Sequence, residues 1–123
     1  MKKENKYNLE ERTAKFSEET IKFCNSLKKD ALALPLLTQL IRAVTSIGAN
    51  YTEANGASSK KDFANKIFIC KKEAQEAKYW LRLLKTSHPE NKKKIEKLWN
   101  EAQELTLIFQ KITSTIRNGA ITK

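Results

Sequence analysis

Two of the 14 acidic residues in this sequence merit a closer look for acid–base chemistry, and its one histidine could serve only as the partner of a cysteine nucleophile. Glu53 lies near the end of one predicted helix, Glu76 lies midway along the next, and His88 precedes Pro89 in a predicted loop. Acid–base catalysis requires such groups to meet a substrate in a cleft, and no further residues in the sequence indicate one. We therefore expect both carboxylates to pair with nearby bases or to satisfy buried polar groups. No catalytic residue is predicted.

The sequence also lacks the residue patterns that are typical of metal and cofactor sites. A di-metal centre in a helical bundle needs repeated Glu-x-x-His pairs, whereas His88 is the only histidine. Cys24 and Cys70 form no CxxC pair, and there is no glycine-rich phosphate or dinucleotide loop. Both cysteines lie in or beside apolar helical stripes, which predicts buried and unreactive thiols. No metal, cofactor or small-molecule substrate is expected.

Positive charge is the main chemical feature of the chain. Its 24 Lys and Arg residues against 14 Asp and Glu residues give a formal charge of +10, which favours an anionic partner such as nucleic acid or acidic lipid. Lys71, Lys78 and Lys85 recur every seven residues, so they should lie along one edge of a helix. The candidate contacts to phosphate are this row and the basic residues near it: Lys71, Lys78, Arg82, Lys85, Lys92, Lys93 and Lys94.

Other interpretations of the same region stay open. Tyr79 and Trp80 could stack on unpaired bases, although aromatic residues at such positions more often fill a core edge or an interface. A row of lysines is also a common solubility device.

Four amphipathic helices with short connections must position these residues. The first should begin at Asn8 with Glu11 completing a capping box, and should end near residues 28–30. The second begins near Pro35, the third begins after a cap at Ser58 or Ser59 and runs to about Thr86, and the fourth runs from Pro89 to about Gly119. Gly56 is expected to close the second helix in the left-handed conformation.

The apolar residues of each helix alternate in steps of three and four, which predicts a bundle seam. The expected core stripes begin with Leu9, Thr13, Phe16, Thr20, Phe23 and Leu27, then Leu37, Leu40, Val44, Ile47, Tyr51 and Ala54, then Phe63, Ile67, Cys70, Ala74, Ala77, Leu81 and Leu84, and finally Ile95, Leu98, Ala102, Leu105, Phe109, Ile112 and Ile116. The predicted fold is all-α, an antiparallel up-down-up-down four-helix bundle forming a single domain over residues 1–123, with 1–7 as a flexible basic tail. The start of the chain shows no export signal and no stretch is apolar enough to span a membrane, so a cytoplasmic location is expected.

The second helix has unusually few charges. Between residues 36 and 54 only Arg42 and Glu53 are charged. A helix with one side in water would be expected to carry more. This predicts burial on more than one side, with further copies of the chain covering the helix.

The junction between the second and third helices resembles a known family. Ser46-Ile47-Gly48-Ala49-Asn50-Tyr51-Thr52-Glu53-Ala54-Asn55-Gly56, followed by Ser59, Lys61, Asp62 and Phe63, is similar to the pattern S-I-P-S-N-I-A-E-G-x-G-R-x-S-x-K-E-F of the bacterial four-helix-bundle proteins, also called the 23S rRNA intervening-sequence proteins. Glu76 matches an acidic position in the following helix. The matching candidate structural residues are Asn50, Glu53, Gly56, Ser59, Phe63 and Glu76. Gly48, Ala54 and Ala57 depart from the pattern, where Pro, Gly and Arg are usual, and the missing Arg removes one charge that could contact phosphate.

The resemblance implies a four-helix bundle assembled as a homopentamer, in a family whose molecular function is not established. The leading hypothesis is a non-enzymatic homo-oligomer that binds RNA or DNA through sequence-indifferent lysine contacts. The alternative is a protein-interaction scaffold whose charge only confers solubility.

Overall fold

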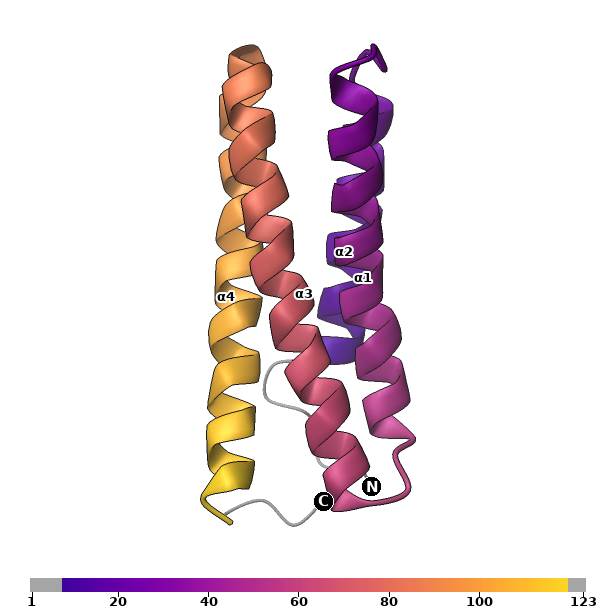
Figure 1. Cartoon of the computed structure of the whole chain (residues 1–123), viewed down its shortest axis with the longest axis vertical. Helices are drawn as coiled ribbons and strands as arrows, with labels where there is room; N and C mark the ends of the chain where they lie inside the picture. Colours follow the sequence, from indigo (N-terminus) through magenta and orange to yellow (C-terminus); the bar gives the residue numbers. More distant parts are fainter. Residues whose placement is uncertain (1–7, 120–123) are drawn as a thin grey trace.

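The computed structural model describes residues 8–119, which form four α-helices and one short 3-10 helix (Figure 1). The elements in chain order are α1 (Leu9–Asn25), α2 (Ala33–Asn55), α3 (Lys60–Ser87), η1 (Pro89–Asn91) and α4 (Lys92–Arg117). No strand occurs in this part of the chain. The predicted all-α class and four helices are confirmed, and the helices pack as a bundle.

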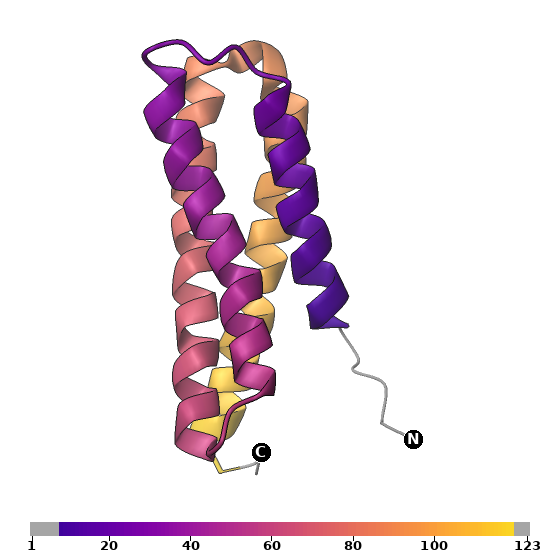
Figure 2. The same ribbon diagram turned by 90° about the vertical axis from the view of Figure 1, so that its right-hand side faces the viewer.

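Helix α3 lies between α2 and α4 and packs extensively against both (Figure 1). Its polar contacts show the direction of each neighbour. Along the α3–α4 seam, residue numbers rise by seven in α3 as they fall by seven in α4, from Lys71–Gln110 through Lys78–Gln103. Helix α2 also runs opposite to α3, because Arg42 contacts Glu76 while Glu53 contacts Lys66. The α1–α2 loop and the α3–α4 connection therefore lie at one end of the bundle (Figure 2).

The core consists of one cluster of buried side chains from all four helices. The stripe predicted for the first helix is buried from Leu9 to Leu27, and so is the stripe predicted for the second helix. The stripes of α3 and α4 are buried except for Phe63, Ile112 and Ile116, which are half-buried near the other end of the bundle. The alternation of three and four thus identified the inward face of each helix.

The helix ends match the prediction only in part. Ser59 caps α3 through a hydrogen bond from the Asp62 amide (3.0 Å) to its hydroxyl oxygen. The capping box at Asn8 is wrong, because Asn8 is left-handed (φ 46°) and its side chain makes no capping bond. Gly56 was also predicted wrongly, since its φ is −98°, whereas Gly119 has φ +77° just after α4. The predicted tail at residues 1–7 lies outside the described residues.

The first helix ends earlier than expected, at Asn25. Asp30 lies in the loop before α2, where its carboxylate accepts a hydrogen bond from the Ala33 amide (2.9 Å) at the start of that helix. Lys29 donates to the carbonyl oxygens of Cys24 (3.0 Å), in the last turn of α1, and of Leu27 (3.3 Å), just after the helix. Lys29 therefore stabilises the end of α1 without extending the helix.

Helix α1 approaches α2 closely at Gly48. A Cβ atom added at Gly48 would lie 3.5 Å from the Thr13 Oγ1 atom and 3.6 Å from its Cβ, which is ordinary van der Waals contact. Glycine in a helix interior costs about 0.5–1 kcal/mol relative to alanine. We expect Gly48→Ala to raise the free energy of unfolding by about that amount in urea denaturation. Gly48→Leu is the control, because its larger side chain should separate α1 from α2, and a loss of stability in Gly48→Ala would contradict the packing described.

Candidate nucleic-acid interface

The lysine row predicted on α3 faces α4. Each of its ammonium groups donates to an α4 side chain: Lys71 to Gln110 (2.8 Å), Lys78 to Gln103 (2.5 Å) and Lys85 to Glu96 (3.3 Å). The row thus helps to join α3 to α4. Only Lys85 meets a carboxylate, so Lys71 and Lys78 keep their charge uncompensated by these contacts. Lys78 also lies 5.1 Å from the centre of the Trp99 ring, a cation–π arrangement.

The remaining candidate residues lie at the end of the bundle that holds the α1–α2 loop and the α3–α4 connection. Arg82, Lys92, Lys93 and Lys94 are exposed and form no ion pair with any residue between 8 and 119. The α1–α2 loop brings two more lysines to the same end (Figure 2). We call this surface the basic end, and its residues are Lys28, Lys29, Arg82, Lys85, Lys92, Lys93 and Lys94.

Sequence reasoning missed Lys28 and Lys29, because only the topology of the bundle brings the α1–α2 loop to the α3–α4 connection. The local spacing of residues 28 and 29 gives no sign of it. The signal that could have found them is the alternation of helix direction, which places the first and third connections together.

The first turn of α4 concentrates three of these lysines at an unfavourable place. Lys92, Lys93 and Lys94 begin the helix, whose first turn has no acidic residue. A helix N-terminus carries a partial positive charge, so lysines there are repelled by the helix dipole. Their charge does not serve the stability of α4, and an anion bound nearby would offset both the dipole and the lysines.

A surface groove between α3 and α4 adjoins the basic end. It has a volume of about 490 Å³, and Leu81 and Ile95 are the core residues in its lining. Its polar and aromatic lining comprises Arg82, Lys85, Thr86, Glu96, Trp99 and Asn100. Cationic and aromatic groups thus line one concave surface.

The family-motif residues belong to the α2–α3 junction. Asn50 donates from its side-chain nitrogen to the Ser46 carbonyl (2.8 Å), and Glu53 pairs with Lys66 (2.7 Å) across the two helices. Phe63 is half-buried against the core. Together with the Ser59 cap, these contacts shape the turn between α2 and α3.

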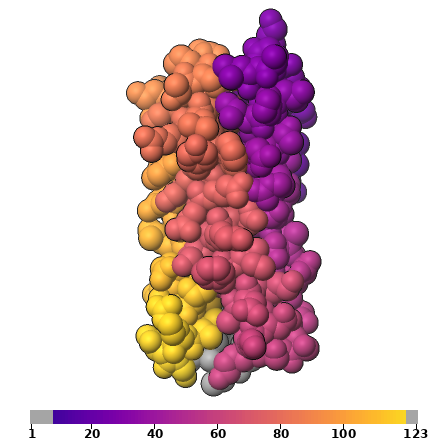
Figure 3. All heavy atoms as spheres, in the orientation of Figure 1, coloured from indigo at the N-terminus to yellow at the C-terminus, as the bar shows by residue number. Residues whose placement is uncertain are grey.

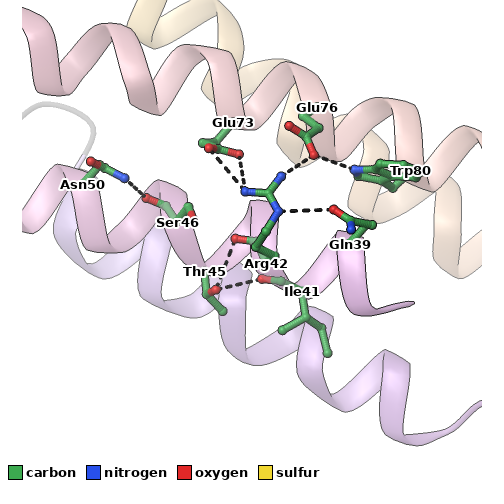
Figure 4. Close-up of polar contacts among 9 residues, drawn as sticks. All are labelled: Gln39, Ile41, Arg42, Thr45, Ser46, Asn50, Glu73, Glu76 and Trp80. Atoms are coloured by element: carbon green, nitrogen blue, oxygen red, sulfur yellow. Dashed lines mark hydrogen bonds and ion pairs between the residues drawn. The ribbon is translucent and has the colours of Figure 1, made fainter. Parts of the chain in front are cut away.

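Glu76 belongs to a polar network on the outer side of the same two helices (Figure 4). Its carboxylate accepts hydrogen bonds from Arg42 and from the indole nitrogen of Trp80 (2.9 Å). Arg42 also contacts Glu73 at 3.3 Å. The bond from Trp80, followed by the bond and charge of Arg42, lowers the pKa of Glu76, and Arg42 has a correspondingly raised pKa. Both carboxylates considered for acid–base chemistry, Glu53 and Glu76, are thus engaged with cations.

The two cysteines are free and buried, as the sequence predicted. Burial raises the pKa of the Cys24 thiol to about 11 and that of Cys70 to about 12. Both groups are therefore protonated at neutral pH. Within residues 8–119, no group of three or more His, Cys, Asp or Glu side chains could hold a metal ion. None of the helices in that range is long and apolar enough to cross a membrane.

A second groove, of about 560 Å³, separates α1 from α4. Arg12 spans it, with hydrogen bonds to Glu101 (2.8 and 3.0 Å) and to Glu104 (2.6 Å). This double ion pair raises the pKa of Arg12. The contact was not predicted, because Arg12 and its partners are about ninety residues apart and no local pattern connects them.

Comparison with known proteins identifies the family. The family model described as 23S rRNA-intervening sequence protein matches residues 5–111. The chain belongs to this family. A crystal structure from Bacteroides thetaiotaomicron VPI-5482, of a protein with unknown function from the S23 ribosomal protein family, is 30% identical in sequence with a TM-score of 0.75. The match covers 85% of this chain and 96% of that one. No curated protein matches.

For this member of the intervening-sequence family, the network around Glu76 predicts a pH-dependent contribution to stability. A carboxylate whose pKa is lowered on folding stabilises the protein above its unfolded pKa of about 4.3, and that stability is lost as the pH falls through the lower folded pKa. We expect Glu76→Gln to reduce the free energy of unfolding by about 0.5–1 kcal/mol near pH 7, because the group is partly exposed. The difference from wild type should narrow below about pH 4, as measured by urea denaturation.

Glu18→Gln is a control for this measurement, because Glu18 is an exposed carboxylate that forms no ion pair with another residue between 8 and 119. A difference between wild type and Glu76→Gln that stays constant down to about pH 3 would contradict the assignment.

Proposed function

We propose that the protein is a non-enzymatic, cytoplasmic homo-oligomer of up-down-up-down antiparallel bundles that binds RNA or DNA through its basic end. The observation that carries the proposal is the set of lysines in the first turn of α4. They are exposed, have no ion-pair partner between residues 8 and 119, and lie at the positive end of the helix dipole. Charge that costs helix stability and is not neutralised internally favours an external polyanion.

The distribution of the cations of the basic end over several elements indicates which kind of polyanion they would bind. The basic end draws residues from both connections and from the last turns of α3, so its cations lie on several elements. Phosphate backbones are bound by such distributed lysine and arginine contacts, with release of counterions and without base reading. The family name refers to 23S rRNA, and this supports RNA as the first ligand to test.

The oligomer is proposed from the outer side of α2. Within one chain, α2 packs on α1 and α3 and leaves one side exposed, which is the side that further copies of the chain would cover if the sequence prediction holds. The exposed side carries Arg42 and Glu53, which pair with α3, and beside them an uncharged row that we call the neutral stripe: Leu34, Thr38, Thr45, Ala49 and Thr52. Leu34 is 51% exposed, and an uncharged surface of this kind is suited to contact between copies.

The threonines of the neutral stripe recur every seven residues and make the same contact. Each hydroxyl donates to the carbonyl four residues earlier in α2: Thr38 to Leu34 (2.9 Å), Thr45 to Ile41 (2.8 Å) and Thr52 to Gly48 (3.0 Å). These hydroxyls need no partner from outside. A second copy could therefore cover the stripe without leaving polar groups unsatisfied.

Removing charge from the basic end should weaken nucleic-acid binding without unfolding the protein. We expect Lys92→Gln/Lys93→Gln/Lys94→Gln to bind a structured rRNA fragment more weakly. The slope of log affinity against log salt should become shallower by roughly 0.9 for each duplex phosphate that the variant no longer neutralises. Fluorescence anisotropy over a series of salt concentrations measures both the affinity and its dependence on salt. Helix α4 should be no less stable in the variant, because these lysines oppose its dipole.

The matched control, Lys60→Gln/Lys111→Gln/Arg117→Gln, removes the same charge at the opposite end of the bundle. Equal reductions in affinity in the two triple variants would contradict a role for the basic end. Absence of binding by the wild-type protein at low salt would contradict the nucleic-acid function and favour the alternative of a protein-interaction scaffold.

A charge in the neutral stripe should separate the copies. Light scattering is expected to give a multiple of the chain mass for the wild-type protein, a pentamer if the family resemblance holds, and a smaller assembly for Thr45→Glu. Thr115→Glu on α4 is the matched control, because its hydroxyl makes the same contact four residues back, to Lys111 (2.8 Å). A monomeric wild-type protein would contradict the interface.

A further inference from the structure

The outward side of α3 carries a continuous exposed row that is distinct from the lysine row facing α4. Every third or fourth residue from Lys61 to Thr86 points away from the core. We call these residues the outer row: Lys61, Asn65, Phe68, Lys72, Gln75, Tyr79, Arg82 and Thr86, all exposed. Helix α3 runs across the face shown in Figure 3, and because all eight residues are exposed, the row is open to solvent along its length.

Two aromatic rings lie on this row. Phe68 is 52% exposed and Tyr79 is 54% exposed. They are eleven residues apart, or about three helical turns, so both face the same side at a separation of about 16 Å along the helix. The spacing follows the helix geometry and leaves an exposed segment between the rings.

Neighbouring side chains position both rings. Tyr79 packs edge-on against Trp80, with ring centres 5.1 Å apart at 68°, and Trp80 is hydrogen-bonded to Glu76. The ammonium group of Lys71 lies 5.2 Å from the centre of the Phe68 ring. The rings are therefore oriented without being covered.

The charges of the row have one sign. Lys61, Lys72 and Arg82 are basic, and none of the eight residues is acidic. The carboxylates beside the row are Asp62, Glu73 and Glu76, and the last two contact Arg42. Copies that met row to row would bring Lys61, Lys72 and Arg82 against one another with no acidic residue of the row to offset them, whereas the neutral stripe of α2 carries no charge.

Alternating cations and exposed rings match the chemistry of an unpaired nucleic-acid strand. Bases that are not paired stack on aromatic side chains, and the backbone follows a positively charged track. Paired bases in a duplex offer no free faces to the rings. Cations alone would bind a single strand and a duplex alike, so a preference for the single strand must come from the two rings.

We propose that the outer row of α3 binds an unpaired strand of RNA or DNA, with bases stacked on Phe68 and Tyr79 and phosphates contacted by Lys72 and Arg82. This inference rests on the proposed function and narrows it, because it names single-stranded nucleic acid as the preferred ligand. It also adds a second surface to the basic end, with Arg82 shared by both.

The test compares a labelled oligouridine strand with an RNA duplex of the same length, by fluorescence anisotropy. Wild-type protein should prefer the single strand. Phe68→Ala and Tyr79→Ala should each weaken single-strand binding by about tenfold, and the double variant by more. Duplex affinity and the salt dependence should stay close to wild type, because the phosphate contacts remain.

Two control variants separate stacking from other effects. Tyr79→Phe keeps the ring and should bind the single strand as wild type does. Leu107→Ala removes another exposed apolar side chain, 57% exposed on α4, and should change nothing. Circular dichroism and light scattering check that each variant keeps its helices and its oligomeric state.

The outcomes distinguish this inference from the proposed function. Equal affinity for the single strand and the duplex, or unchanged single-strand affinity in the two alanine variants, would contradict the outer row as a single-strand site. Weaker binding by Lys92→Gln/Lys93→Gln/Lys94→Gln in the same experiment would still support the basic end as a nucleic-acid site. A smaller assembly in the Phe68→Ala/Tyr79→Ala variant would show that the row is an interface between copies, and would also overturn it. No binding to either ligand by wild type would remove the proposed function and the inference together.

Discussion

The close packing of α3 against both α2 and α4 determines the position of the lysine row, the Glu76 network and the exposed rings. Small buried side chains line these contacts, and they let the helix axes approach: Ala43, Ala54, Cys70, Ala74, Ala77 and Ala102. Because α3 is held between two helices, each of its sides faces either a known neighbour or solvent. The side toward α4 carries the lysine row, the side toward α2 carries the Glu76 network, and the outward side carries the exposed rings. A change in the rotation of α3 would alter all three together.

Much of the fold could be predicted from the sequence, because hydrophobic periodicity reports directly on which face of a helix is buried. The stripes from Leu9 to Leu27 and from Leu37 to Ala54 were correct residue by residue. The helix ends were less predictable. Asn8 and Gly56 have residue types that favour particular conformations, but neighbouring backbone contacts decide whether those conformations are adopted, and neither residue behaved as expected.

The candidate site was only partly predictable, for a different reason. Spacing by seven placed Lys71, Lys78 and Lys85 on one edge, but it could not tell whether that edge meets water or another helix. The structure shows that it meets α4. Lys28 and Lys29 join the basic end through topology alone. Contacts between residues far apart in the chain, such as Arg12 with Glu101, depend on the mutual rotation of two helices, which no single segment encodes.

The loose junction between α1 and α4 creates a hierarchy of stability within the molecule. Helix α1 packs mainly on α2 and has few contacts with α4, and the Arg12 ion pairs cross the groove that separates them. Helices α2, α3 and α4 share a continuous set of contacts that does not pass through α1. Detaching α1 therefore exposes less apolar surface than separating the other three, so local opening that begins there requires less free energy than global unfolding. The molecule thus consists of three helices, α2, α3 and α4, joined by continuous contacts, with α1 attached along one side.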